Sequence, residues 1–186
     1  YGLERHKSVP NRKNIHHIED KLHFIKGDLS DLGSLISAVS EIRPDELYNF
    51  ASQSFVGDSW RLPEYTCDIT GMGVLRLLEA VRTTSPTTRV QQASSSEMFG
   101  AKGSTLANES TPFHPRSPYA VAKVFGHLTA QNFRESYGLF VSSSICFNHE
   151  SERRGFEFVT RKISSSVARI HYGLQTHINL GTLDSS

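Results

Sequence analysis

The chain has 186 residues, enough for one domain with a substantial hydrophobic core. Hydrophobic residues make up 37% and charged residues 21%, and the formal net charge of +1 comes from scattered basic residues. Nucleic acid and membrane are therefore not expected as partners, because no basic cluster and no apolar run of ~18 residues occurs. Cys67 and Cys146 are too few for a disulfide framework and the 9 histidines lack metal-ligand spacing, so we expect no metal and a reducing, cytoplasmic location.

Predicted strands and helices alternate along the chain. Apolar residues recur every three or four positions in the helical stretches, whereas the strands are short apolar runs. Ser117 is expected to cap a helix that has Pro118 at its first position, and Gly173 to end the last helix. The expected elements are a strand at 21–27, a helix at 31–42, a buried strand at 46–51, a long helix from 63 to before 86, a strand at 89–94, a helix at 117–137, a strand at 139–147, a helix at 156–172 and a strand at 177–180.

This alternation predicts an α/β fold with a doubly wound, mostly parallel sheet of the Rossmann-like kind. In such sheets ligands bind at the carboxyl ends of the strands. Unusual polar residues follow four of the predicted strands, which indicates a ligand site at one edge of the sheet. They are Asp28 and the residues of 51–54, 94–97 and 148–150.

The most informative segment is Tyr119-Ala-Val-Ala-Lys123 in the predicted helix 117–137. Residues four apart lie on one helical face with Cβ atoms roughly 5–6 Å apart, so the Lys123 ammonium is expected beside the Tyr119 ring. That charge is worth on the order of 3 kcal/mol at an effective dielectric of about 20. It would lower the phenol pKa from near ~10 into the range useful for proton transfer. Ser95 and Glu97 add a hydroxyl and a carboxylate at the preceding strand end.

No glycine-rich pyrophosphate-binding turn follows a first strand in this sequence. The chain opens at Tyr1-Gly2-Leu3-Glu4-Arg5, as though a strand–turn–helix had come before it, and closes without a capping element. We therefore expect an interior fragment that lacks its first strand–turn–helix and its C-terminal substrate region.

Seven segments carry a resemblance to a known family. They are G-D-L-S-D (27–31), L-Y-N-F-A-S-Q-S (47–54), E-Y-T (64–66), L-R-L-L-E-A (75–80), Q-A-S-S-S-E-M-F-G (92–100), T-P-F-H-P-R-S-P-Y-A-V-A-K (111–123) and F-N-H-E-S-E-R-R-G-F-E-F-V-T-R-K-I (147–163). Together they resemble the extended short-chain dehydrogenase/reductase family, and they look most like its GDP-mannose 4,6-dehydratase branch. The last segment is the most specific, because related epimerases and dehydratases share the Tyr and Lys but not this stretch.

The resemblance implies an internal redox cycle on GDP-mannose. NADP takes hydride from carbon 4 of the hexose, water is eliminated across carbons 5 and 6, and the hydride returns to carbon 6. Tyr119 would be the acid/base at the 4-hydroxyl, and Lys123 would lower its pKa and bind the nicotinamide ribose. Glu97 would be the acid/base for carbon 5 and the departing 6-hydroxyl, which favours a dehydratase over an epimerase. Ser95 would hydrogen-bond the 4-oxygen, where the family usually carries threonine.

Further contacts are implied by the same resemblance. Arg5, with His6 and Lys7, follows the presumed second strand, where the 2′-phosphate of NADP would lie. The other implied cofactor contacts are Asp28, Leu29, Phe50, Ala51, Ser52, Gln53, Ser54, Tyr65, His149 and Arg154. The implied nucleotide-sugar contacts are Asn148, Glu150, Thr160 and Lys162. Residues 1–186 would thus be an NADP-binding Rossmann-like domain, with 147–186 leading into the nucleotide-sugar-binding part, and the family suggests a homodimer or homotetramer.

Several alternatives stay open. Another sugar-nucleotide enzyme, such as an epimerase or a decarboxylase, shares the Tyr–Lys pair. A truncated chain that binds a nucleotide sugar without chemistry is a second alternative, supported by the absent glycine-rich turn. Single residues also have plainer explanations: Asp28 as a helix cap, Tyr65 and His149 as core residues, and Arg154 as a solvated charge.

Overall fold

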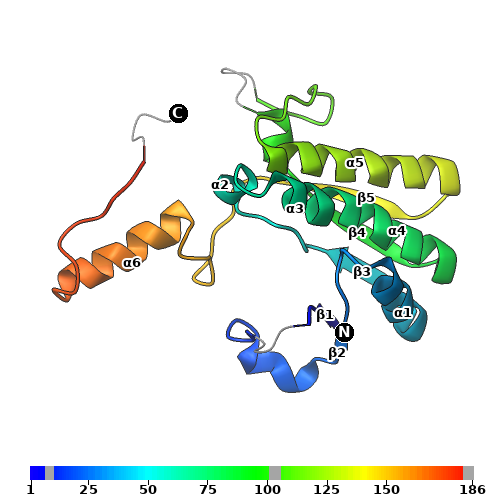
Figure 1. Ribbon diagram of the computed structural model, residues 1–186, viewed down its shortest axis with the longest axis horizontal. Helices are drawn as coiled ribbons and strands as arrows, with labels where there is room; N and C mark the ends of the chain where they lie inside the picture. The colour runs from blue at the N-terminus through cyan, green and yellow to red at the C-terminus, as the bar shows by residue number, and fades with distance from the viewer. Residues whose placement is uncertain (7–10, 101–105, 182–186) are drawn as a thin grey trace. The chain divides into compact units, whose positions relative to one another are not determined.

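The structure is a computed structural model that describes residues 1–6, 11–100 and 106–181 (Figure 1). Lys7, which was expected near the cofactor, lies outside the described residues. The chain forms two compact units, Tyr1–Phe147 and Asn148–Ser186, and each is described by itself. Among the described residues, every helix is too short or too polar to traverse a lipid bilayer.

The described strands of the first unit are all parallel, which confirms the predicted α/β class. They form two sheets rather than the one sheet that was expected. In the smaller sheet β1 (Gly2–Glu4) pairs with β2 (Phe24–Lys26). In the larger sheet β4 (Arg89–Ser95) lies between β3 (Glu46–Asn49) and β5 (Val141–Cys146).

The helices of the first unit connect these strands (Figure 1). They are the 3-10 helix η1 (His16–Lys21), α1 (Leu32–Ile42), α2 (Val56–Ser59), α3 (Pro63–Cys67), the π-helical turn η2 (Asp68–Met72), α4 (Gly73–Thr84), the 3-10 helix η3 (Ser96–Phe99) and α5 (Pro118–Tyr137). The predicted long helix from 63 is therefore present as α3, η2 and α4 in succession. Helix α5 contacts η2, α4, β4 and β5.

The hydrophobic core lies between the helices and the larger sheet. Helix α4 contributes Val74, Leu77, Leu78 and Val81 from one face, as its apolar spacing requires. Full burial of one such side chain stabilises the fold by about 1.5–3 kcal/mol. This core fixes the position of α5 relative to β4.

The helix ends follow the sequence signals. Asp31 caps α1, and its Oδ1 accepts a hydrogen bond from the Gly33 N–H at 2.9 Å. Ser117 caps α5 with Pro118 at the first position, as predicted, and its Oγ accepts from the Ala120 N–H at 3.1 Å. The Ser117 cap fixes the first turn of α5, and this helix contacts β4 and η3.

Three expectations about secondary structure are wrong. The strand at 46–51 is shorter than expected and only partly buried, since Asn49 is 4% exposed but Tyr48 is 61% exposed. Its apolar composition was taken for burial on both faces, but β3 is an edge strand of its sheet. Residues 177–180 form no strand, and α2 was not foreseen, because a four-residue helix has too few residues to show a period.

The second unit contains α6 (Val159–His171), which begins later than the predicted residue 156. Phe158, in extended conformation, occupies the N-cap position without a side-chain cap. Gly173 follows with a φ of 70°, as a left-handed residue that ends a helix should. The Leu174 N–H then bonds the Arg169 carbonyl at 2.8 Å.

Candidate active site and cofactor cleft

Tyr119 and Lys123 lie one turn apart near the start of α5. Both side chains are buried, with 9% and 5% of their surfaces exposed. Lys123 Nζ lies 5.6 Å from the Tyr119 ring centroid and donates a hydrogen bond to the Ala93 carbonyl of β4 at 2.8 Å. Burial lowers the pKa of Lys123 to about 8, so the ammonium form still predominates at neutral pH. The structure therefore places a cation next to this phenol.

Ser95 and Glu97 stand at the carboxyl end of β4, which α5 contacts. Ser95 is the last residue of β4 and also the N-cap of η3, and its Oγ accepts a hydrogen bond from the Glu97 N–H at 3.2 Å. Ser95 is buried whereas Glu97 is exposed. Helix α5, which carries Tyr119 and Lys123, contacts both β4 and η3, and Lys123 bonds the carbonyl of Ala93, two residues before Ser95.

A cleft of ≈ 1460 Å³ runs along β1 and β3 in the first unit. Its apolar part is lined by α1 and α4 through Leu35, Val39 and Leu77. Polar residues line it at the carboxyl ends of β1, β2 and β3, where parallel sheets bind ligands, and also at the amino end of β3, through Arg43, Asp45, Glu46 and Arg89. Nine of the cofactor residues that were predicted within the first unit line this cleft, whereas Lys123 and His6 do not. The nine are Arg5, Asp28, Leu29, Phe50, Ala51, Ser52, Gln53, Ser54 and Tyr65.

Hydrogen bonds hold the polar part of the cleft in shape. The Gln53 N–H donates to Thr70 Oγ1 at 3.1 Å, and the Ala51 N–H to Asn49 Oδ1 at 3.2 Å, which fastens the loop after β3. Tyr65 is 42% exposed, so it is not a core residue, and its hydroxyl accepts from Arg5 Nη1 at 3.1 Å. Arg5 is thus oriented by a residue that is distant in sequence.

The turn after β2 settles one of the open alternatives. Asp28 Oδ1 accepts from the N–H and the hydroxyl of Ser30, both at 2.9 Å, so Asp28 shapes this turn and does not cap α1. Leu29 is 5% exposed and packs on Gly73, where a Cβ atom would lie 2.8 Å from the Leu29 Cβ. The Leu29 side chain therefore also belongs to the hydrophobic core.

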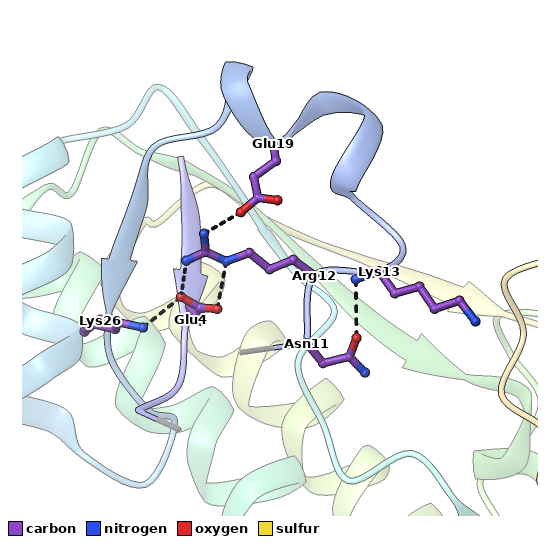
Figure 2. A network of polar contacts seen from close by, with 6 residues as sticks. All are labelled: Glu4, Asn11, Arg12, Lys13, Glu19 and Lys26. Carbon is purple, nitrogen blue, oxygen red and sulfur yellow. Dashed lines mark hydrogen bonds and ion pairs between the residues drawn. The ribbon is translucent and has the colours of Figure 1, made fainter. Parts of the chain in front are cut away.

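A network of charged side chains was not foreseen from the sequence (Figure 2). Glu4, the last residue of β1, accepts from Arg12 Nη2 at 2.9 Å and from Lys26 Nζ at 2.8 Å. Arg12 also bonds Glu19 at 2.6 Å and lies over the Phe24 ring, 4.0 Å from its centroid. These cations lower the pKa of Glu4 to about 2, Arg12 contributing most. No sequence signal reveals the network, because its members are isolated charges in a polar stretch.

A second polar pair that the sequence did not indicate joins β4 to α5. Ser94 Oγ lies 2.9 Å from His127 Nδ1. Burial, with a smaller effect of Arg134, lowers the pKa of His127, so its ring is neutral at pH 7. This pair links the strand that ends in Ser95 to the helix that carries Lys123.

The predicted nucleotide-sugar contacts lie in the second unit. Glu150 Oε2 accepts from Thr160 Oγ1 at 2.5 Å and forms an ion pair with Arg154 at 3.3 Å. The Arg154 guanidinium also lies over the Phe158 ring, 3.5 Å from its centroid. Asn148, His149 and Lys162 are exposed. Glu150, Arg154 and Thr160 therefore form one group within this unit.

The parallel sheets with helices between their strands define a Rossmann-like α/β protein. The family model described as GDP-mannose 4,6 dehydratase matches residues 1–186. The GDP-mannose 4,6-dehydratase of Yersinia enterocolitica is 47% identical over 194 aligned residues, which cover 100% of this chain and 52% of that protein. The chain thus belongs to the GDP-mannose 4,6-dehydratase family.

Solved structures show the same fold. The dTDP-glucose 4,6-dehydratase DesIV of Streptomyces venezuelae, with NAD and TYD bound, matches with a TM-score of 0.80 at 26% identity, covering 92% of this chain and 52% of that one. RMD of Pseudomonas aeruginosa, complexed with NADPH, matches with a TM-score of 0.76 at 26% identity, covering 88% and 59%. The chain spans about half the length of the curated relatives it matches.

Proposed function

We propose that this chain carries the cofactor-binding and acid/base part of an NADP-dependent lyase that converts GDP-mannose to GDP-4-keto-6-deoxymannose. The observation that carries the proposal is the buried pair on α5, with Lys123 Nζ 5.6 Å from the Tyr119 ring and fixed to β4. The family match supports the dehydratase and disfavours an epimerase or a decarboxylase.

The residues around β4 and α5 would divide the proton transfers among them. The Tyr119 phenol would take the proton of the sugar 4-hydroxyl, since the neighbouring ammonium stabilises a negative charge on its oxygen. Ser95 Oγ would hydrogen-bond the same oxygen as it becomes a carbonyl. The exposed Glu97 carboxylate would remove the carbon-5 proton and pass a proton to the departing 6-hydroxyl, which leaves as water.

The residues at the carboxyl ends of β1, β2 and β3 would hold a dinucleotide, because parallel sheets bind ligands at these ends and a guanidinium and a hydrogen-bonded loop stand there. When bound, NADP would supply the acceptor for the carbon-4 hydride and the donor that returns it to carbon 6. Arg5, Asp28, Leu29, the loop 50–54 and Tyr65 would hold it in the first unit, with Lys123 at the nicotinamide ribose. His149 and Arg154 would add contacts from the second unit.

The substrate would contact the second unit, through Asn148, Glu150, Thr160 and Lys162. We also propose a cytoplasmic location and a homodimer or homotetramer. An apolar stripe on α5 supports the assembly: Val121, Phe125 and Leu128 are 50%, 41% and 47% exposed. They recur at helical spacing on the surface, as at a helix–helix interface.

The test is to incubate the chain with GDP-mannose and NADP and to follow the sugar nucleotide by mass and by the absorbance of the 4-keto product. We expect loss of one water per molecule converted. Glu97→Gln should still oxidise carbon 4, seen as transient absorbance of reduced cofactor, but should not release water. No product, together with GDP binding and no NADP binding by calorimetry, would support the truncated, non-catalytic alternative instead.

A further inference from the structure

We infer that Arg12 and Lys26 hold the Glu4 carboxylate out of ligand recognition, so that Arg5 selects a nucleotide that carries a 2′-phosphate. This inference rests on the proposed NADP site, and it assigns roles to Glu4, Arg12 and Lys26 that the site itself did not include. Glu4, Arg12 and Lys26 lie on or next to the β1–β2 pair (Figure 2), and Arg5 directly follows β1.

The position of Glu4 makes it a potential competitor of Arg5. A carboxylate at the end of such a strand commonly accepts hydrogen bonds from the ribose hydroxyls of NAD, whereas an arginine nearby accommodates the 2′-phosphate of NADP. Here Glu4 ends β1 and Arg5 follows it, and both line the cleft. A free Glu4 would therefore attract the ribose hydroxyls and repel a phosphate at the same place.

In the structure both carboxylate oxygens of Glu4 accept hydrogen bonds from neighbouring side chains. Arg12 approaches both carboxylate oxygens, with Nε 3.3 Å from Oε1 and Nη2 2.9 Å from Oε2. Lys26 Nζ binds Oε2 at 2.8 Å. Neither Arg12 nor Lys26 is among the residues that line the cleft, so both hold Glu4 from outside it.

Among the described residues at this end of the cleft, the charge balance leaves Arg5 as the deciding group. Arg12 is paired with both Glu4 and Glu19, and Lys26 is paired with Glu4. The two cations thus balance the charges of the two carboxylates. The other carboxylate at this end of the cleft is Asp28, whose Oδ1 is taken by the backbone and hydroxyl of Ser30. Arg5 donates to the Tyr65 hydroxyl, and its guanidinium forms no ion pair with the residues that the structure describes.

The alternative is that these ion pairs only fasten η1 to the strand pair. Arg12 does link Glu4 to Glu19 of η1 and lies on Phe24 of β2. The two explanations differ in what they predict when the charge of Glu4 is removed by replacing it with glutamine. If masking matters, then a variant that lacks Arg12 should regain phosphate selection once Glu4 is also replaced by glutamine; a fastening role predicts no recovery.

The experiment measures the ratio of the dissociation constants of AMP and adenosine 2′,5′-bisphosphate for the chain, by calorimetry at low salt. We expect the parent to prefer the bisphosphate and Arg12→Ala to reduce that preference about tenfold, as an uncovered like charge near a phosphate should. Arg12→Ala/Glu4→Gln should return to within about threefold of the parent. Lys26→Ala, which leaves Arg12 on Phe24, should act in the same direction as Arg12→Ala but less strongly.

Arg82→Ala is the matched control, because Arg82 forms a comparable pair with Glu79 on α4 away from the cleft, and it should leave the ratio unchanged. A parent that binds neither nucleotide or does not distinguish them would overturn the inference, and so would a double variant that stays as poor as Arg12→Ala. These outcomes are separate from the sugar chemistry. If GDP-mannose is converted to product but AMP and adenosine 2′,5′-bisphosphate bind equally well, only this inference is contradicted.

Discussion

Helix α5 with strand β4, and the strand pair β1–β2, are held in place by different forces. On α5 the side chains of Tyr119 and Lys123 are buried, and Lys123 is bonded to the Ala93 carbonyl of β4. In the β1–β2 pair no residue is buried, and Glu4 is held by Arg12 and Lys26, whose side chains are 30% and 42% exposed. The residues proposed for acid/base chemistry are thus held by burial, whereas those proposed for ligand selection are held by ion pairs near the surface. Mutations in the core should therefore affect the first region most, and changes of pH and salt the second.

The largest effect is expected from Tyr119→Phe, which removes one hydroxyl and keeps the buried ring. Turnover of GDP-mannose should fall about 10²–10⁴-fold, the usual contribution of general acid–base catalysis, with binding constants within a few-fold. Tyr137→Phe makes the same chemical change on the same helix, where the side chain is 55% exposed, and should have no effect. Unchanged turnover in Tyr119→Phe would remove the tyrosine from its role.

The next effect concerns the core that positions α5. Leu78 is 1% exposed, so Leu78→Ala should lower the free energy of unfolding by about 2–5 kcal/mol, measured by urea denaturation. Leu3→Ala, in β1 at 45% exposure, should cost clearly less. Equal losses would contradict the view that the two regions depend on burial to different degrees.

The lowered pKa of Lys123 predicts that the free energy of unfolding changes at alkaline pH. Its pKa of about 8 in the folded state lies below the value of about 10.4 in an unfolded chain, so the unfolded state binds more protons between these values. The free energy of unfolding should therefore rise by up to about 3 kcal/mol as pH rises from about 8 to about 10.4. Lys123→Met should remove this rise, and a parent curve without it would show that the ammonium is better solvated than the structure indicates.

The smallest effect is expected at acid pH in the β1–β2 pair. Hydrogen bonds from Arg12 and then Lys26 lower the pKa of Glu4 to about 2, so its stabilising contribution is present above its unfolded value and is lost as pH falls through about 2. Amide hydrogen exchange in β1 and β2 should therefore accelerate as pH falls towards 2, beyond the intrinsic pH dependence. Glu4→Gln should remove that extra acceleration, and salt should mimic it in the parent because these charges are only partly buried.

Features that depend on residues close together in the sequence could be predicted, whereas those that depend on distant residues could not. The α5 cap at Ser117 and the Tyr119–Lys123 pair are local, and the sequence predicted both. The division into two sheets and the exposure of Tyr48 depend on which strand edges are paired, and no short-range pattern reports this.

By itself the sequence determined the alternation of parallel strands and helices, the family and the identity of the acid/base candidates, because period, caps and motif spacing act over a few residues. Only the tertiary structure decided that Lys123 is fixed by the Ala93 carbonyl, that Asp28 shapes a turn, and that Glu4 is neutralised by Arg12 and Lys26. These contacts join residues through folding rather than through a local motif, and the electrostatic state of a charged group depends on which neighbours folding brings to it.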